Sequence, residues 1–173
     1  MVDHSSTPRS RSGKAKEDGS SKKKQVVAGE KPPFAVVSAK RSFAVSAERI
    51  YDAWLNPEII GQWMFGSAVR SEQIVRLVVE VRVGGSFSFV VRRKGTEIDH
   101  VGTYLTLDRP NRLVFTWGIR EGDSGRVSVE IIDRGAGCDL ILNHELHPDW
   151  SDSAGRADPG WTKMLKVLSS LFD

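Results

Sequence analysis

The sequence predicts an α+β domain in which a curved antiparallel sheet wraps around a long C-terminal helix. Three observations lead to this prediction. Segments with apolar residues at every second position fill the middle of the chain, two short helical patterns follow the first strand, and a long apolar stripe of helical spacing ends the chain. That last helix must bury its stripe, and the concave face of a strongly curved sheet is the large surface available to it. Such an arrangement is a helix-grip fold.

The first 33 residues differ in composition from the rest. They are rich in Ser, Lys, Arg, Gly, Asp and Glu, with almost no aliphatic residues, so residues 1–33 are expected to be a disordered basic tail and residues 34–173 the folded domain. Residues 1–31 hold eight basic and four acidic residues, a net charge of +4, whereas the remainder holds 17 and 18, a net charge of −1. The sequence therefore disfavours a nucleic-acid-binding domain, and any phosphate contact would go through the lysine run 22–24.

Several classes of protein are disfavoured by missing features. A single cysteine, Cys138, excludes an internal disulfide framework and any multi-cysteine metal site, and it is expected to be packed rather than nucleophilic. There is no apolar run of the ~18 residues that a membrane span requires and no secretory signal, so the expected compartment is the cytoplasm. No phosphate-binding glycine loop, dinucleotide fingerprint or nucleophile elbow is present, and no cofactor is expected.

The domain opens with a predicted strand from Phe34 to Val45. Ser46 follows as an N-cap, and the next apolar residues have helical spacing: Ile50, Tyr51, Trp54 and Leu55. Pro57 ends that helix, because a residue before proline avoids the α region, and it can start a second short helix over 58–63.

From Gln73 onward the apolar period is two. Gln73 to Val83 is apolar on nearly both faces, which predicts a strand that is in part buried on both sides. Gly84 and Gly85 predict a tight hairpin. The remaining strands are predicted from the alternation of apolar residues after that hairpin, over 86–92, 97–107, 113–119, 127–132 and 138–147.

The C-terminal segment returns to helical spacing. Its apolar stripe consists of Trp161, Met164, Leu165, Leu168, Leu171 and Phe172, and Pro159 suits the first turn of this helix.

Several blocks, in order, resemble a known family. They are 50–58 with Gln62-Trp63-Met64, then 81–89, 100–105, 110–117 and Gly160-Trp161. On these blocks, Phe43 to Phe172 resembles the START-like, or SRPBCC, superfamily, and within it the homologues of the activator of heat-shock-protein-90 ATPase. The resemblance implies a deep cavity between the sheet and the C-terminal helix, in a superfamily that binds lipids, sterols, polyketides or other apolar molecules.

The resemblance also bears on partners. The eukaryotic co-chaperone carries an additional N-terminal domain, and the first 33 residues here are too short and too polar to supply it. Direct activation of the chaperone ATPase is therefore not expected, although a stress-related role and contact with a chaperone stay open as hypotheses.

The histidines give two hypotheses about chemistry. His144 and His147 are three apart on a predicted strand, so they point to opposite faces, and a shared metal ion is not expected. His100 shares a strand face with Tyr104, so an imidazole and a phenol could enter one cavity and act as general acid or base. A structural or surface role for this pair is the favoured alternative.

The leading hypothesis is non-catalytic binding of a small apolar or amphipathic molecule. Two alternatives are a polyketide cyclase- or dehydratase-like enzyme that uses His100 and Tyr104, and a protein-interaction module that resembles a chaperone cofactor and exposes an apolar patch. The candidate cavity residues are mostly aromatic; they are Trp63, Phe65, Phe87, Phe89, His100, Tyr104, Trp117, Trp161, Leu165 and Leu168.

Overall fold

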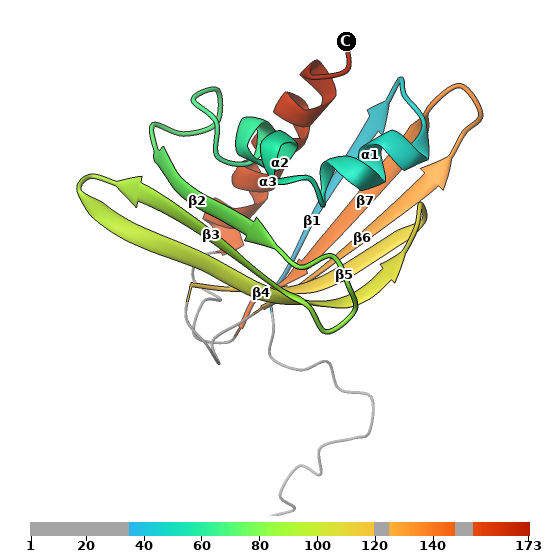
Figure 1. The fold of residues 1–173 in the computed structure, drawn as a ribbon. Coiled ribbons are helices and arrows are strands. Elements are labelled where there is room, and N and C mark those ends of the chain that lie inside the picture. The colour runs from blue at the N-terminus through green and yellow to red at the C-terminus, as the bar shows by residue number, and fades with distance from the viewer. Residues whose placement is uncertain (1–34, 120–124, 148–153) are drawn as a thin grey trace, which may run out of the picture. The chain divides into compact units, whose positions relative to one another are not determined.

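Seven antiparallel strands form one strongly curved sheet in the computed structural model, which describes residues 35–119, 125–147 and 154–173 (Figure 1). The order across the sheet is β1-β7-β6-β5-β4-β3-β2, so β1 and β2 are its two edges. The strands are β1 (Val36–Phe43), β2 (Gln73–Val79), β3 (Ser86–Arg93), β4 (Thr96–Asp108), β5 (Arg112–Trp117), β6 (Gly125–Asp133) and β7 (Cys138–Glu145). The predicted tail, 1–33, lies outside the described residues.

Three helices lie on the concave side of the sheet (Figure 1). The two short ones, α1 (Ala47–Ala53) and α2 (Pro57–Trp63), connect β1 to β2, and α3 (Ala154–Ser170) follows β7. The predicted helix-grip arrangement is confirmed: a long C-terminal helix packs against the inner face of a curved antiparallel sheet.

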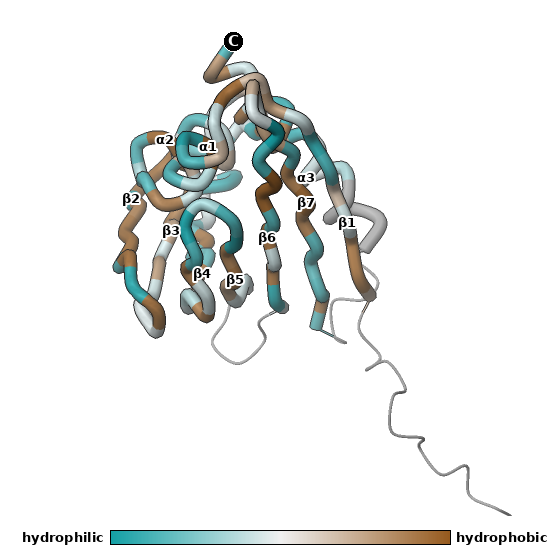
Figure 2. Tube along the Cα trace, turned by 90° about the vertical axis from the view of Figure 1, so that its right-hand side faces the viewer, coloured by the Kyte–Doolittle hydropathy of each residue, from teal (hydrophilic) through white to brown (hydrophobic). Residues whose placement is uncertain are grey.

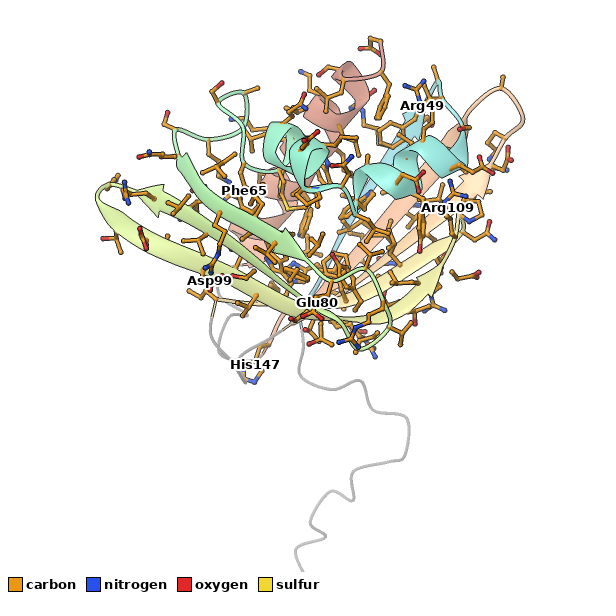
Figure 3. All side chains as sticks on the ribbon, viewed as in Figure 1. Arg49, Phe65, Glu80, Asp99, Arg109 and His147 are labelled. Atoms are coloured by element: carbon orange, nitrogen blue, oxygen red, sulfur yellow. The ribbon has the colours of Figure 1, made fainter. Side chains whose placement is uncertain are left out.

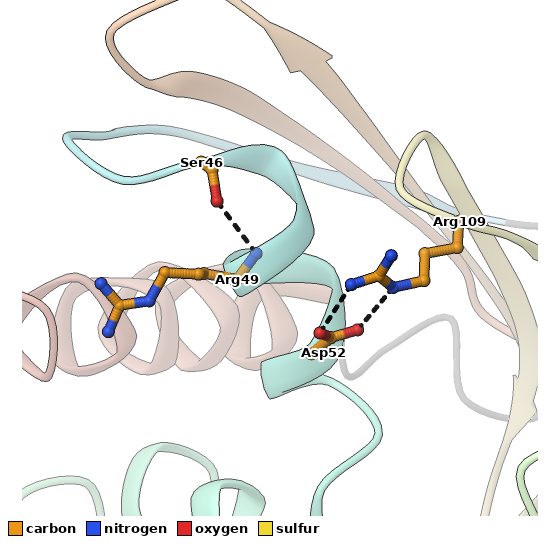
Figure 4. Close-up of polar contacts among 4 residues, drawn as sticks. All are labelled: Ser46, Arg49, Asp52 and Arg109. Atoms are coloured by element: carbon orange, nitrogen blue, oxygen red, sulfur yellow. Dashed lines mark hydrogen bonds and ion pairs between the residues drawn. The ribbon is translucent and has the colours of Figure 1, made fainter.

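Side-chain caps begin both short helices. The Ser46 hydroxyl accepts a hydrogen bond from the Arg49 amide at 3.4 Å (Figure 4), and the Asn56 side-chain oxygen accepts one from the Glu58 amide at 3.0 Å. Each cap satisfies one amide that has no partner within its own helix. Pro57 occupies the first turn of α2, as predicted.

Two polar contacts hold α1 in place. Arg109, after β4, makes a bidentate ion pair with Asp52, with both N–O distances at 2.9 Å (Figure 4). The Arg49 guanidinium lies 4.8 Å from the centre of the Phe172 ring and so links α1 to the end of the chain beyond α3. Both contacts lie at the surface, where such pairs contribute little free energy of folding and mainly fix position.

The core is the inner face of the sheet together with the apolar stripe of α3. Apolar and polar residues alternate along the strands, as the colours in Figure 2 show for β6 and β7. In β7 the residues Cys138, Leu140 and Leu142 point inward and are buried, and their neighbours are partly exposed. The stripe on α3 supplies four further buried side chains: Trp161, Met164, Leu165 and Leu168.

One glycine allows the sheet to pack closely in its centre. A Cβ on Gly102 in β4 would collide with the Thr116 carbonyl oxygen and with the ring of Phe87, so only hydrogen fits there. Phe87 lies opposite Gly102 in the β3–β4 register, and its ring covers this position. Gly102 therefore determines where the ring of Phe87 can lie.

Two sequence predictions about element positions were wrong. We predicted a second strand that is partly buried on both sides, but β2 is an edge strand, and Val75 and Val78 are 44% and 47% exposed. The apolar composition of β2 is typical of a central strand, but β2 pairs with β3 alone, and no described strand lies on its other side. We also placed Pro159 in the first turn of the last helix, but α3 begins five residues earlier and contains this proline.

None of the helices among the described residues has the length and apolar content needed to cross a membrane.

Candidate ligand-binding pocket

An aromatic cluster fills the middle of the space between the sheet and the helices. Ring pairs such as Phe87 and Phe89, with centres 4.7 Å apart, and Trp54 and Trp63, also 4.7 Å apart, pack in stacked and edge-to-face arrangements. The gap that remains within this cluster is about 10 Å³, which is room for no more than about one water molecule. Its lining residues are Trp54, Met64, Phe87, Phe89, Tyr104, Phe115 and Trp117.

A larger opening lies beside this cluster, between β4, β5 and β7 on one side and the middle of α3 and the segment after α2 on the other. We call it the α3 pocket. Its volume is about 120 Å³, and its lining combines aromatic rings, two methionines, two histidines and one arginine. The lining residues are Met64, Phe65, Arg70, His100, Trp117, His144, Gly160, Trp161 and Met164.

His144 enters the α3 pocket from β7 and has a hydrogen-bond partner. Its Nδ1 accepts from the indole Nε1–H of Trp161 at 3.0 Å, so the proton of the neutral ring belongs on Nε2. The side chain is 5% exposed, and burial lowers its pKa to about 4. At neutral pH this histidine is therefore uncharged and helps to attach α3 to the sheet.

His100 enters the same pocket from β4, but both of its ring nitrogens are buried without a hydrogen-bond partner among the described residues. It is 7% exposed and lies between two aromatic rings, with centre distances of 5.3 Å to both Phe65 and Trp117. Burial lowers its pKa to about 4, and the positive charge of Arg70 acts in the same direction. The pocket thus contains a neutral imidazole with one donor and one acceptor unused.

A buried carboxylate lies next to the arginine of this pocket. The Glu72 side chain is 1% exposed; one of its oxygens contacts the Arg93 guanidinium and lies 3.9 Å from Nη1 of Arg70. The other oxygen, Oε2, is buried without a hydrogen-bond partner in the described part of the chain. Burial lowers the pKa of Arg70, but a guanidinium remains charged at any ordinary pH.

A turn after α2 positions Arg70. The amides of Val69 and Arg70 both donate to the carbonyl oxygen of Gly66, at 2.9 and 3.0 Å, and this turn directs the chain back toward the sheet. From there the Arg70 side chain reaches α3, because a Cβ built on Gly160 would lie 3.8 Å from its Nη2. The Arg70 side chain, which is 35% exposed, therefore lines the α3 pocket at its solvent-accessible side.

The structure distributes the ten candidate cavity residues over three places. Phe65, His100, Trp117 and Trp161 line the α3 pocket. Phe87, Phe89 and Tyr104 surround the nearly closed gap in the aromatic cluster, which Trp117 also reaches. The other three lie in the core and line neither space; they are Trp63, Leu165 and Leu168.

His100 and Tyr104 share the inner face of β4, but they line different spaces. Phe87 lies between them, because its ring covers Gly102, the residue halfway between the two. Burial raises the pKa of the Tyr104 hydroxyl far above its usual range. The imidazole and the phenol are therefore not directed at one common substrate position.

Sequence reasoning missed five lining residues: Met64, Arg70, His144, Gly160 and Met164. Two of them carried a usable signal. His144 alternates with Leu140 and Leu142 on β7, which predicts an inward side chain, and Met164 belongs to the apolar stripe of α3. Arg70 gave no such signal, because it lies in a turn where no periodicity predicts a direction.

The described residues contain no group of three or more His, Cys, Asp or Glu side chains that could hold a metal ion. Cys138 is buried, as expected, and burial raises the pKa of its thiol.

Comparison with known proteins agrees with the fold. The model of the family described as activator of Hsp90 ATPase homolog 1-like protein matches residues 44–173. The chain belongs to this family. It is therefore a START-like protein, and its membership of this family indicates a ligand-binding fold. No curated protein matches the chain.

Solved structures of bacterial proteins have the same fold. A protein from Rhodobacter sphaeroides is 19% identical and has a TM-score of 0.70, with 83% of this chain and 95% of that chain covered. A protein from Chromobacterium violaceum is 22% identical and has a TM-score of 0.69, with 79% of this chain and 96% of that chain covered. An AHSA1-like protein from Aeromonas hydrophila is 20% identical with a TM-score of 0.66, and 79% of this chain and 90% of that chain are covered.

Proposed function

We propose that this AHSA1-like domain binds a small apolar or amphipathic molecule in the α3 pocket and does not transform it chemically. The observation that carries the proposal is the pocket itself: an opening of about 120 Å³, lined mainly by aromatic and thioether side chains, in a domain whose central space is otherwise filled. Burial of an apolar ligand there would remove both ligand surface and ring surface from water.

The size of the pocket favours a small ligand. Pockets for drug-sized molecules usually measure about 300–1,000 Å³, whereas an apolar cavity of about 150 Å³ binds benzene. At about 120 Å³, the α3 pocket fits a group of the size of one six-membered ring. A sterol or a long polyketide would need further space, so we infer a compact ligand or the compact end of a larger one.

The chemistry of the lining favours binding over catalysis. A general base works best when its pKa lies near the working pH, but both pocket histidines have pKa values of about 4. Tyr104, the partner proposed for an acid–base pair, faces the aromatic cluster instead. The cyclase- or dehydratase-like alternative needs both His100 and Tyr104 in one pocket, and Tyr104 does not line the α3 pocket.

A pair of substitutions at Gly160 tests the proposal. This glycine of α3 lines the pocket, and a Cβ there has ordinary van der Waals space, so alanine should be accepted, whereas the longer side chain of leucine would extend into the pocket. We expect isothermal titration calorimetry to report saturable binding of at least one of benzyl alcohol, indole and benzoate. Gly160→Leu should weaken that binding about tenfold or more by filling the pocket, and Gly160→Ala should weaken it much less.

Two results would contradict the proposal. The first is that none of the three probes binds the unmodified protein at millimolar concentration. The second is that Gly160→Leu, shown to be folded by circular dichroism, binds the probes as well as Gly160→Ala does, because the binding site would then lie elsewhere.

A protein-interaction module is a second candidate, supported by the edge strand β2. Val75 and Val78 in β2, and Val81 and Val83 in the segment that follows it, are 44% to 62% exposed, and an edge strand also presents unpaired backbone groups. Titration of a purified Hsp90-type chaperone with the domain would test it. Binding that Val78→Lys abolishes would support this candidate, and absence of binding would reject it.

A further inference from the structure

The α3 pocket carries a positive charge that the described groups around it do not fully balance. Two guanidiniums, Arg70 and Arg93, lie beside the buried carboxylate of Glu72, so among these three described side chains one positive charge is left over. Of these two cations, Arg70 is the one that lines the pocket.

The other carboxylate whose charge reaches His100 lies on the far side of the sheet. Asp99 is adjacent to His100 on β4 and therefore points to the opposite face, where it accepts a hydrogen bond from Ser88 at 2.7 Å. Figure 3 shows Phe65 on the helix side of the sheet and Asp99 on the other side. The interior side of the pocket thus keeps its positive charge.

His100 supplies a second, independent observation. Its side chain is more than nine-tenths buried and lines the pocket, and neither ring nitrogen has a hydrogen-bond partner among the described residues. An unpaired buried polar group costs free energy, so an oxygen of a ligand that accepted the imidazole N–H would recover part of that cost. A neutral imidazole and a guanidinium in one small pocket are complementary to a carboxylate, which accepts from both.

We propose that the ligand is a compact organic acid, whose carboxylate is bound by Arg70 and His100 and whose apolar body packs against Trp117 and Trp161. This inference rests on the proposed binding function and adds the chemical class of the ligand. The pocket limits the body to about one ring or a short aliphatic chain. Aromatic acids fit best, because the two indoles and Phe65 offer rings for stacking or edge contacts.

The test compares two probes of nearly equal shape, benzoate and benzyl alcohol, by isothermal titration calorimetry at pH 7.5. We expect the unmodified protein to bind benzoate about tenfold or more tightly than the alcohol, since only benzoate gains the charge-assisted hydrogen bonds. Arg70→Gln should remove that preference and leave the affinity for the alcohol within about threefold. Arg70→Lys keeps the charge without the bidentate geometry, so this variant should retain part of the preference for benzoate.

The matched control is Arg134→Gln, which removes the same charge from an exposed arginine directly after β6 that does not line the pocket, and it should leave both affinities unchanged. Glu72 keeps its Arg93 partner in the Arg70 variants, so these variants should fold. Equal or tighter binding of benzyl alcohol by the unmodified protein would overturn the inference but leave the proposed function standing. If benzoate, benzyl alcohol and indole all fail to bind, the proposed function itself is wrong.

Discussion

Replacing His100 with phenylalanine should stabilise the ligand-free protein, although His100 lies in the interior and its ring packs between Phe65 and Trp117. The imidazole brings one donor and one acceptor into a site where the described residues offer no partner for either. Phenylalanine keeps a planar ring at this position and removes both polar atoms. The substitution is therefore expected to remove an unfavourable term and retain most of the packing.

The size of the effect follows from the two unpaired nitrogens. Each buried polar group without a partner costs about 1–3 kcal/mol, so the lower limit for both gives about 2 kcal/mol. For a domain of this size, 1 kcal/mol corresponds to about 2–4 °C in Tm, and we expect a rise of about 4–8 °C. The neighbouring pocket of about 120 Å³ can accommodate the slightly larger ring.

The matched control is His144→Phe, which should change stability in the opposite direction. His144 is as buried as His100, lines the same pocket and has the same lowered pKa of about 4. It differs in accepting the Trp161 indole N–H at 3.0 Å. The variant would leave that N–H buried and unpaired, at a cost of about 1–3 kcal/mol.

Urea unfolding at pH 7.5, followed by tryptophan fluorescence, measures both changes, and both histidines are neutral at this pH in the folded and the unfolded chain. An unchanged m-value would show that the variants unfold from comparable states. If His100→Phe lowers the free energy of unfolding by 1 kcal/mol or more, His100 makes hydrogen bonds in the folded protein, and the argument for an unused donor and acceptor fails.

Three further predictions concern pH and the two glycines. Because burial lowers the folded-state pKa of His100 and His144 to about 4 from an ordinary value of 6.5, the unfolded chain binds more protons between these values. The free energy of unfolding, measured in urea titrations, should therefore decrease as the pH is lowered, by about 2 kcal/mol per histidine between pH 7 and pH 5. A free energy of unfolding that does not change over this range would contradict this prediction. Gly102→Ala should cost about 3 kcal/mol or more in the same assay, because its Cβ meets the Thr116 carbonyl oxygen; a loss below 1 kcal/mol would be evidence against that collision. Gly160→Ala should raise Tm by gaining about 0.5–1 kcal/mol of helix propensity in α3, and a lower Tm would mean that the methyl group disturbs Arg70.

Most of the fold could be predicted from the sequence, because its two periodicities are strong and do not overlap. Residues 138–145 alternate so regularly that their burial could be assigned before the structure, and the spacing from Trp161 to Leu168 fixes which face of α3 is buried. The predicted cap at Ser46 and the position of Pro57 likewise gave the starts of the two short helices. Local patterns of this kind need no information about distant residues.

Edge position and helix start could not be predicted in the same way. Whether β2 has a neighbour on both sides depends on the order of strands in the sheet, and its valines look the same in a central strand and at an edge. Similarly, α3 begins upstream of Pro159, although proline is more common in the first turn of a helix. In both cases the tertiary arrangement decided against the local preference.

The position of the pocket was the least predictable feature, because a cavity is the space that packing leaves over rather than a property of any one residue. Two glycines explain where that space lies. At Gly102 the missing side chain is replaced by the ring of Phe87, and the space between His100 and Tyr104 is closed. At Gly160, Nη2 of Arg70 is the one described atom within 4 Å of where a side chain would begin, and the pocket remains open. At Gly102 the absence of a side chain lets a ring fill the interior, whereas at Gly160 it leaves space for the α3 pocket. The His100 imidazole and the Arg70 guanidinium both line that remaining space.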